Sequence, residues 1–202
     1  MLTRSRRLGL LLLLVAVAMP VASAAQPRHD DGPATKAITC AACHGAAGNS
    51  RSDAMPILAG MDVAYFKKQI QDYAKGGRPS PEMEPYAKQT LDLGADDIAA
   101  FFARQKPERT PIAAEAAAVA RGREAASPCV ICHGADGKGD RAKLIPSLAG
   151  QPPGYLRAQM LLFKQDQRNP KDDALKALKA LMRTIADERL ADLAAYYSSL
   201  TP

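Results

Sequence analysis

The sequence predicts an all-α protein built from two similar domains in tandem. Much of the chain repeats at an offset of about 90 residues, and apolar residues recur at three- and four-residue spacing along Ala-rich stretches. No stretch alternates convincingly as a β-strand. The length of 202 residues suits two domains.

The repeated parts follow the same order in both halves. A Cys-x-x-Cys-His-Gly motif at Cys40 returns at Cys129, and a Pro-x-Leu-Ala-Gly segment at Pro56 returns at Pro146. The later parts are a Tyr, a Gln, an Arg and an Ala-Ala-aromatic-aromatic stretch. They begin at Tyr65 and Tyr155, Gln69 and Gln159, Arg78 and Arg168, and Ala99 and Ala194. Each half is therefore expected to fold as its own domain.

The domain borders are expected where this pattern breaks. Two prolines and several charges at residues 106–111 lie between helical patterns, which predicts a linker at 107–112. The domains then span residues 25–106 and 113–202. Within them, helices are predicted at 95–104, 113–126 and 186–200, and long polar loops at 44–55 and 133–145.

Residues 1–24 are predicted to be an export signal that is removed. Arg4, Arg6 and Arg7 precede an apolar run, and small residues at 22–24 offer a cleavage site. The run of about 12 residues is shorter than the roughly 20 needed to span a bilayer, which disfavours a retained anchor. Arg6 and Arg7 allow a twin-arginine signal, but a generic basic region also explains them. We expect the mature chain in the periplasm.

Composition excludes one class of partner and favours a cofactor. Removing the signal lowers the formal net charge from +6 to +3, because three arginines leave with it. The remaining Lys and Arg are interspersed with Asp and Glu, so no nucleic-acid footprint is visible. Aromatic residues are 5% of the chain and Trp is absent. A buried macrocycle would supply the apolar volume that such small domains lack.

The Cys-x-x-Cys-His motifs predict one covalently attached haem c in each half. Two thiols three positions apart lie on one face of a helical turn, so each can form a thioether with a haem vinyl group while the adjacent His binds the iron. The attaching residues are Cys40, Cys43, Cys129 and Cys132, and the axial ligands are His44 and His133.

Three alternative readings explain the cysteines less well. A zinc ribbon places its Cys pairs roughly 15 to 20 residues apart, whereas a whole domain separates them here. A thioredoxin-like pair needs a βαβ context, and none is visible. Structural disulfides occur in exported proteins, but they do not explain why a His follows both pairs.

The sixth ligand of each iron is expected to be a methionine. His29 is the one histidine outside the motifs and lies in a polar stretch, so two His ligands on both irons are impossible. Met83 and Met182 precede the final helix of their halves, where a loop could bring sulfur to the iron. Met55, Met61 and Met160 face other residue types in the repeat and are assigned to packing or the surface.

As a set, these motifs resemble the cytochrome c4 family of exported di-haem proteins over nearly all of the mature chain. The resemblance implies two tandem class I cytochrome c domains, each wrapped around its haem. It implies that carbonyls near Pro56 and Pro146 accept the Nδ1 protons of the axial histidines. It also places four side chains near haem edges or propionates, with ordinary packing and solvated charge as the alternative. These are Tyr65, Arg78, Tyr155 and Arg168.

The second ligand loop departs from the pattern. Between Arg168 and Met182 there are 13 residues, against 4 between Arg78 and Met83. A short helix is predicted at 172–181, with Met182 at its end. Lysines in this stretch are alternative ligands, but each must first lose a proton, which is costly given a reference pKa of about 10.4. They are Lys171, Lys176 and Lys179.

Closed His and Met coordination predicts an electron carrier with no catalytic residues and no place for substrate. We expect it to take electrons from a quinol-oxidising complex or a dehydrogenase and to pass them to a terminal oxidase or reductase. A monomer is expected, and peripheral membrane association stays open. The alternatives are a small di-haem redox enzyme, an electron-accepting subunit of a dehydrogenase such as one for thiosulfate oxidation, and a gas sensor. A sensor would need an output domain.

Overall fold

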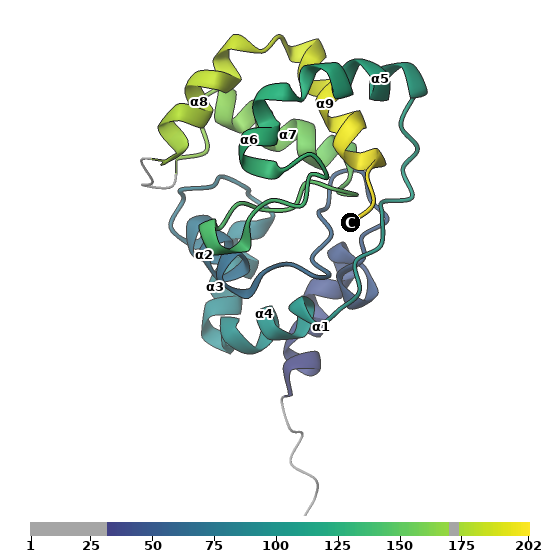
Figure 1. Ribbon diagram of the computed structural model, residues 1–202. Coiled ribbons are helices and arrows are strands. Elements are labelled where there is room, and N and C mark those ends of the chain that lie inside the picture. Colours follow the sequence, from purple (N-terminus) through teal and green to yellow (C-terminus); the bar gives the residue numbers. More distant parts are fainter. Residues whose placement is uncertain (1–31, 170–173) are drawn as a thin grey trace, which may run out of the picture. The chain divides into compact units, whose positions relative to one another are not determined.

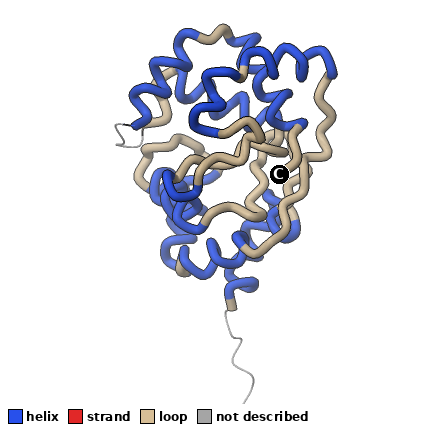
Figure 2. Tube along the Cα trace, viewed as in Figure 1, coloured by secondary structure: helices blue, strands red, loops and turns tan. Residues whose placement is uncertain are grey.

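The computed structural model describes residues 32–169 and 174–202, and it confirms the all-α prediction (Figures 1 and 2). In these ranges the regular structure is helical, and the β contact is an isolated bridge between Asp140 and Ile145. No helix there is long and apolar enough to cross a membrane. The predicted export signal at 1–24 and His29 lie outside the described residues, so the signal stays a prediction.

Helices of the N-terminal half enclose one apolar core. They are α1 (Pro33–His44), the short 3-10 helix η1 (Ala46–Gly48), α2 (Val63–Ala74), α3 (Met83–Leu93) and α4 (Ala95–Ala103). Phe66 and Ile70 lie one turn apart on α2, and Ile98 and Phe102 lie one turn apart on α4, so both helices turn an apolar face inward. The Phe66 and Phe102 rings lie 6.0 Å apart between centroids.

A second, separate core lies in the C-terminal half. Its helices are α5 (Ala116–Ala125), α6 (Ser127–His133), the 3-10 helix η2 (Arg141–Lys143), α7 (Pro153–Lys164), α8 (Ala174–Thr184) and α9 (Asp187–Ser199). Leu156 of α7 packs with Leu190 and Leu193 of α9, and both leucines of α9 are fully buried. Two cores with the same order of parts match the predicted tandem arrangement.

A close crossing of α5 and α9 holds the C-terminal half together (Figure 1). A Cβ atom at Gly122 would lie 2.0 Å from the carbonyl oxygen of Asp192, so the crossing requires glycine there. Beside it, the Arg121 guanidinium donates to both carboxylate oxygens of Asp192, with a shortest distance of 2.8 Å. The N-terminal half pairs α1 with α4 in the corresponding way.

The connection between α4 and α5 is held by hydrogen bonds at three of its residues. The Asn49 side chain donates to the Lys106 carbonyl at 3.0 Å and accepts from the Glu108 backbone N–H at 2.9 Å. Further on, the Thr110 N–H donates to the Gly150 carbonyl at 2.8 Å. The segment without helix contains the linker predicted at 107–112, whose bounds stay a prediction. The described residues from 32 to 202 belong to one compact unit.

Candidate haem sites

Both Cys-x-x-Cys-His motifs lie at the ends of helices. Cys40, Cys43 and His44 close α1, while Cys129, Cys132 and His133 close α6. The four cysteines are free thiols, which fits thioether attachment and not a disulfide framework. In each motif the first cysteine is half-buried against the core and the second is exposed.

The histidines are oriented as iron ligands need to be. Nδ1 of His44 lies 2.8 Å from the Pro56 carbonyl oxygen, and Nδ1 of His133 lies 3.0 Å from that of Pro146. Because a carbonyl can only accept, Nδ1 carries the proton in both rings and Nε2 is left with its lone pair. Burial lowers the pKa of both histidines, although the hydrogen bond to the carbonyl opposes this. A neutral imidazole is the form that binds a metal ion.

The predicted methionine ligands occupy different places in their helices. Met83 is the first residue of α3, and Met182 lies inside α8, two residues before its end at Thr184. The helix predicted at 172–181 therefore continues to Thr184 and includes Met182, and Met83 likewise belongs to a helix and not to a loop before it. Met182 is 3% exposed and packs within the C-terminal core, which Cys129 and Met160 also border. Their role as ligands stays a prediction.

The sequence left lysines as alternatives to Met182, and the structure places one of them elsewhere. Nζ of Lys179 donates to Asp166 at 2.5 Å and to Asn169 at 2.6 Å. A protonated amine paired in this way cannot bind iron without first giving up both bonds and its proton. Lys171 lies outside the described residues.

Between the halves, two arginines and two glutamines form a buried ring of hydrogen bonds. The Gln69 side-chain oxygen accepts from Arg78 at 2.8 Å and from Arg168 at 2.6 Å. The Gln159 oxygen accepts from the same two arginines at 3.1 and 2.9 Å. Arg78 also donates to the Tyr155 hydroxyl at 2.9 Å. These repeated residues therefore bind across the domain boundary, which the sequence could not predict.

This ring carries two positive charges that nothing described neutralises. Arg78 and Arg168 are 3% and 6% exposed, and within the described part of the chain neither pairs with a carboxylate. The Arg168 Nε–H is buried without any hydrogen-bond partner there. Burying unpaired charge is strongly unfavourable, so the ring fits an anionic group that completes it. The propionates of haem, which the resemblance placed near these arginines, have that chemistry.

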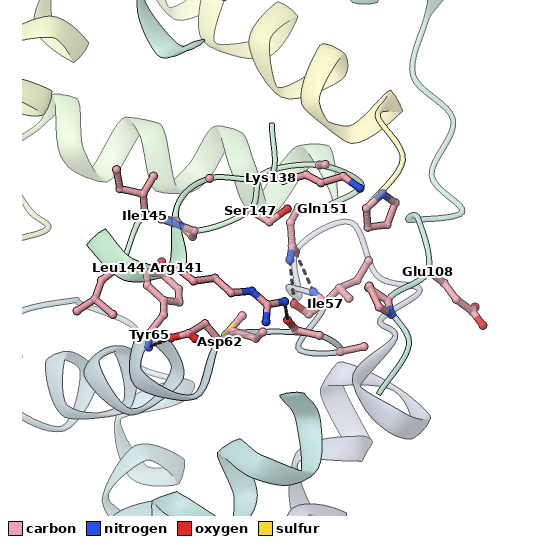
Figure 3. Close-up of a pocket in the computed structure, with 18 residues that line it drawn as sticks. Ile57, Asp62, Tyr65, Glu108, Lys138, Arg141, Leu144, Ile145, Ser147 and Gln151 are labelled. Carbon is pink, nitrogen blue, oxygen red and sulfur yellow. Dashed lines mark hydrogen bonds between the residues drawn. The ribbon is translucent and has the colours of Figure 1, made fainter. Parts of the chain in front are cut away.

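A cavity of about 370 Å³ lies between the two Pro-x-Leu-Ala-Gly segments (Figure 3). Beside it the Gln151 side chain pairs with the backbone of Ile57 in both directions, each bond being 2.9 Å long. Arg141 reaches across toward the Gly60 carbonyl, 3.4 Å away. No cysteine or histidine of the motifs lines the cavity, so it is distinct from the haem attachment sites.

Known families match each half separately. Residues 119–201 match the family described as Cytochrome c. Residues 27–102 match the family described as Cytochrome C oxidase, cbb3-type, subunit III. Two cytochrome c domains, each with its own cysteine pair, imply two covalent haems.

Relatives and solved structures cover both halves at once. A thiosulfate dehydrogenase electron acceptor of Stutzerimonas stutzeri is 32% identical over 95% of this chain and 93% of its own length. Cytochrome c4 of Pseudomonas aeruginosa is 32% identical over 82% of this chain and 85% of its own. Reduced recombinant cytochrome c4 from Pseudomonas stutzeri is similar with a TM-score of 0.76 and 27% identity, over 83% of this chain and 96% of that one. With two oriented histidines, four free thiols and these relatives, the chain belongs to the cytochrome c4 family of di-haem, class I c-type electron carriers.

Proposed function

We propose that the mature chain is a periplasmic carrier that takes electrons singly from a quinol-oxidising complex or a dehydrogenase and passes them to a terminal oxidase or reductase. The observation that carries this proposal is the pair of oriented imidazoles, each held by a proline carbonyl at 2.8 or 3.0 Å with Nε2 left for iron. Two such sites in one compact unit suit either two-electron loading or a relay along the chain.

Each residue of the site has a defined part in the proposal. The motif cysteines would hold haem through thioether bonds. Each S–H would add across a vinyl double bond, with sulfur on one carbon and hydrogen on the other, so no oxidant would be needed. His44 and His133 would each supply one ligand to an iron, and Met83 and Met182 would each supply a second. Haem, once bound, supplies a one-electron ferric and ferrous couple, whose potential a thioether ligand raises.

The buried arginines support a specific arrangement of the two haems. If propionates from both halves complete the ring that Arg78 and Arg168 form with the glutamines, the haem edges meet at the domain boundary. Positive charge next to a haem also disfavours the ferric cation, and this raises its potential. The same contact would then assist electron exchange between the haems and hold the halves together.

Haem content and closed coordination test the proposal. Pyridine haemochrome analysis of the purified protein should give two haems per chain, and the N-terminus of mature protein from periplasmic extract should follow residue 24 closely. Carbon monoxide should bind the reduced protein negligibly at neutral pH, because the proposed His and Met ligands would leave no open position on the iron. One haem per chain, or strong carbon monoxide binding, would count against the carrier and favour the enzyme or sensor alternatives.

One relative favours a second candidate, the electron acceptor of a thiosulfate-oxidising dehydrogenase. That relative is 32% identical over 95% of this chain. A solved thiosulfate dehydrogenase from Marichromatium purpuratum contains a similar part, with a TM-score of 0.71 and 30% identity, over 80% of this chain and 36% of that one. Stopped-flow reduction of the oxidised protein by such a dehydrogenase with thiosulfate, compared with reduction by a quinol-oxidising complex, separates the two donors.

A further inference from the structure

Tyr197 buries a hydroxyl group that has no ordinary partner. The side chain lies on α9 and is 2% exposed. Among the described residues its hydroxyl oxygen makes no hydrogen bond of normal geometry. An unsatisfied buried hydroxyl costs about 1 to 3 kcal/mol, so a group of this kind needs a structural or functional reason.

The position of this hydroxyl points to the haem attachment site. The Tyr197 ring centroid lies 6.5 Å from that of the axial His133. Cys129 borders the same core cluster. Cys129 therefore packs against the group of side chains to which Tyr197 belongs. Burial raises the pKa of the Cys129 thiol, and the Tyr197 hydroxyl opposes this rise.

The N-terminal half has no counterpart to this hydroxyl. Phe102 occupies the corresponding place in the repeat, is 1% exposed, and packs against Phe66 and Phe101. Burial also raises the pKa of the Cys40 thiol, and there the side chain that opposes this rise is the neighbouring Thr39. The C-terminal half therefore has phenols at Tyr196 and Tyr197 where the N-terminal half has phenylalanines, and the Tyr197 hydroxyl is the one left without a partner among the described residues.

We propose that the Tyr197 hydroxyl donates a hydrogen bond to the Cys129 sulfur and thereby raises the reduction potential of the C-terminal haem. This inference rests on the proposed di-haem function. A thioether sulfur has no proton and can only accept, so attachment leaves the phenol as the donor. The bond draws electron density from the macrocycle and sets the positive end of the O–H dipole beside it. Both effects favour the ferrous over the ferric state.

Tyr197→Phe removes the hydroxyl and leaves the ring in place. Loss of a weak hydrogen bond to sulfur should reduce the preference of one haem for the ferrous state about threefold. At 59 mV per tenfold, this lowers the potential of that haem by ~28 mV. The other haem should keep its potential. Tyr196→Phe is the matched control, because it removes the same group from the adjacent buried tyrosine. That control should leave both potentials unchanged.

Two further measurements make the outcome decisive. The native chain and Tyr197→Phe should both carry two haems. A lower count in the native chain would count against the proposed function, whereas a lower count in Tyr197→Phe alone would overturn this inference, because the phenol would then be needed for haem attachment. Proton NMR should show shifted methyl resonances for the haem with nuclear Overhauser contacts to α9, and unshifted ones for the other haem. No shift beyond that of Tyr196→Phe, equal shifts in both haems, or a raised potential would each overturn the assignment.

Discussion

Asp53 caps a helix that belongs to the other half of the molecule. Its carboxylate accepts from the Gly154 N–H at 2.7 Å, and its backbone carbonyl accepts from the Tyr155 N–H at 2.8 Å. In the N-terminal half, α2 is capped from within, since Asp62 accepts from the Tyr65 N–H at 2.9 Å. Pro152 stands at the corresponding position before α7 and has no side-chain acceptor. The first turn of α7 therefore depends on a carboxylate from the N-terminal half.

Asp53→Ala should destabilise the C-terminal half although the substitution lies in the N-terminal one. Losing a helix cap costs about 1 kcal/mol, within a range of about 0.5 to 2. For a unit of this size that lowers Tm by about 2 to 4 °C. Calorimetry of the haem-loaded protein measures the shift, and hydrogen exchange locates it. Protection should fall at the first amides of α7, whereas the matched control Asp62→Ala should lose protection at the start of α2.

Gly154 provides a sharper test of the same contact. A Cβ atom there would lie 2.4 Å from an Asp53 carboxylate oxygen, so Gly154→Ala must displace the capping group. Alanine favours a helix over glycine by about 1 kcal/mol, which roughly offsets the lost cap in the native background. In the Asp53→Ala background the collision is gone and the helix preference remains. The change in the free energy of unfolding caused by Gly154→Ala should therefore be about 1 kcal/mol more favourable in the Asp53→Ala background than in the native one. Additive effects of the two substitutions would refute the contact.

Three further predictions concern the haem sites. Met182→Ala should lower one of the two potentials by at least ~59 mV and abolish half of the sulfur-to-iron charge-transfer absorption, whereas Met160→Ala should do neither. Redox titration with spectra distinguishes them, and the reverse pattern would exchange their roles. Arg78→Met should lower both potentials in the same titration, because it removes a buried positive charge at the domain boundary. Unchanged potentials would argue against haem propionates at that boundary. A chain of residues 112–202 should mature with one haem. Its Tm should be lower than that of the same half in the full protein, because the contacts from Asp53 and Arg78 are missing. An equal Tm would contradict this.

Much of the fold was predictable because the same pattern of residues occurs in both halves of the sequence. Helices predicted at 95–104, 113–126 and 186–200 appear as α4, α5 and α9, each within a few residues. The hydrogen bonds from His44 and His133 to proline carbonyls are confirmed as well. Both kinds of feature are local to one half. Residue spacing and repetition suffice to predict the helices, whereas the hydrogen bonds were implied by the resemblance to the cytochrome c4 family.

Contacts between the halves were not predictable in this way. The repeat marks Gln69, Arg78, Gln159 and Arg168 as paired positions, but it does not say that each glutamine accepts from arginines of both halves. The sequence does indicate, at one position, the cap that Asp53 provides to α7. Pro152 occupies the place that corresponds to Asp62 and has no side-chain acceptor. A missing cap in one copy of a repeat indicates that the donor N–H groups find a partner elsewhere.

The two predicted methionine ligands do not occupy equivalent positions in the repeat. Leu178 and Met182 are four residues apart, so an apolar face continues past the predicted end of the helix, and α8 runs to Thr184. Met83 begins α3, but Met182 follows eight residues after the start of α8, so the two sulfurs are not equivalent by position. Because the halves also differ at Tyr197, two haems in them would have unequal surroundings. Unequal surroundings separate the two potentials, so an electron would rest preferentially on one half, and the resolved waves of a redox titration measure that preference.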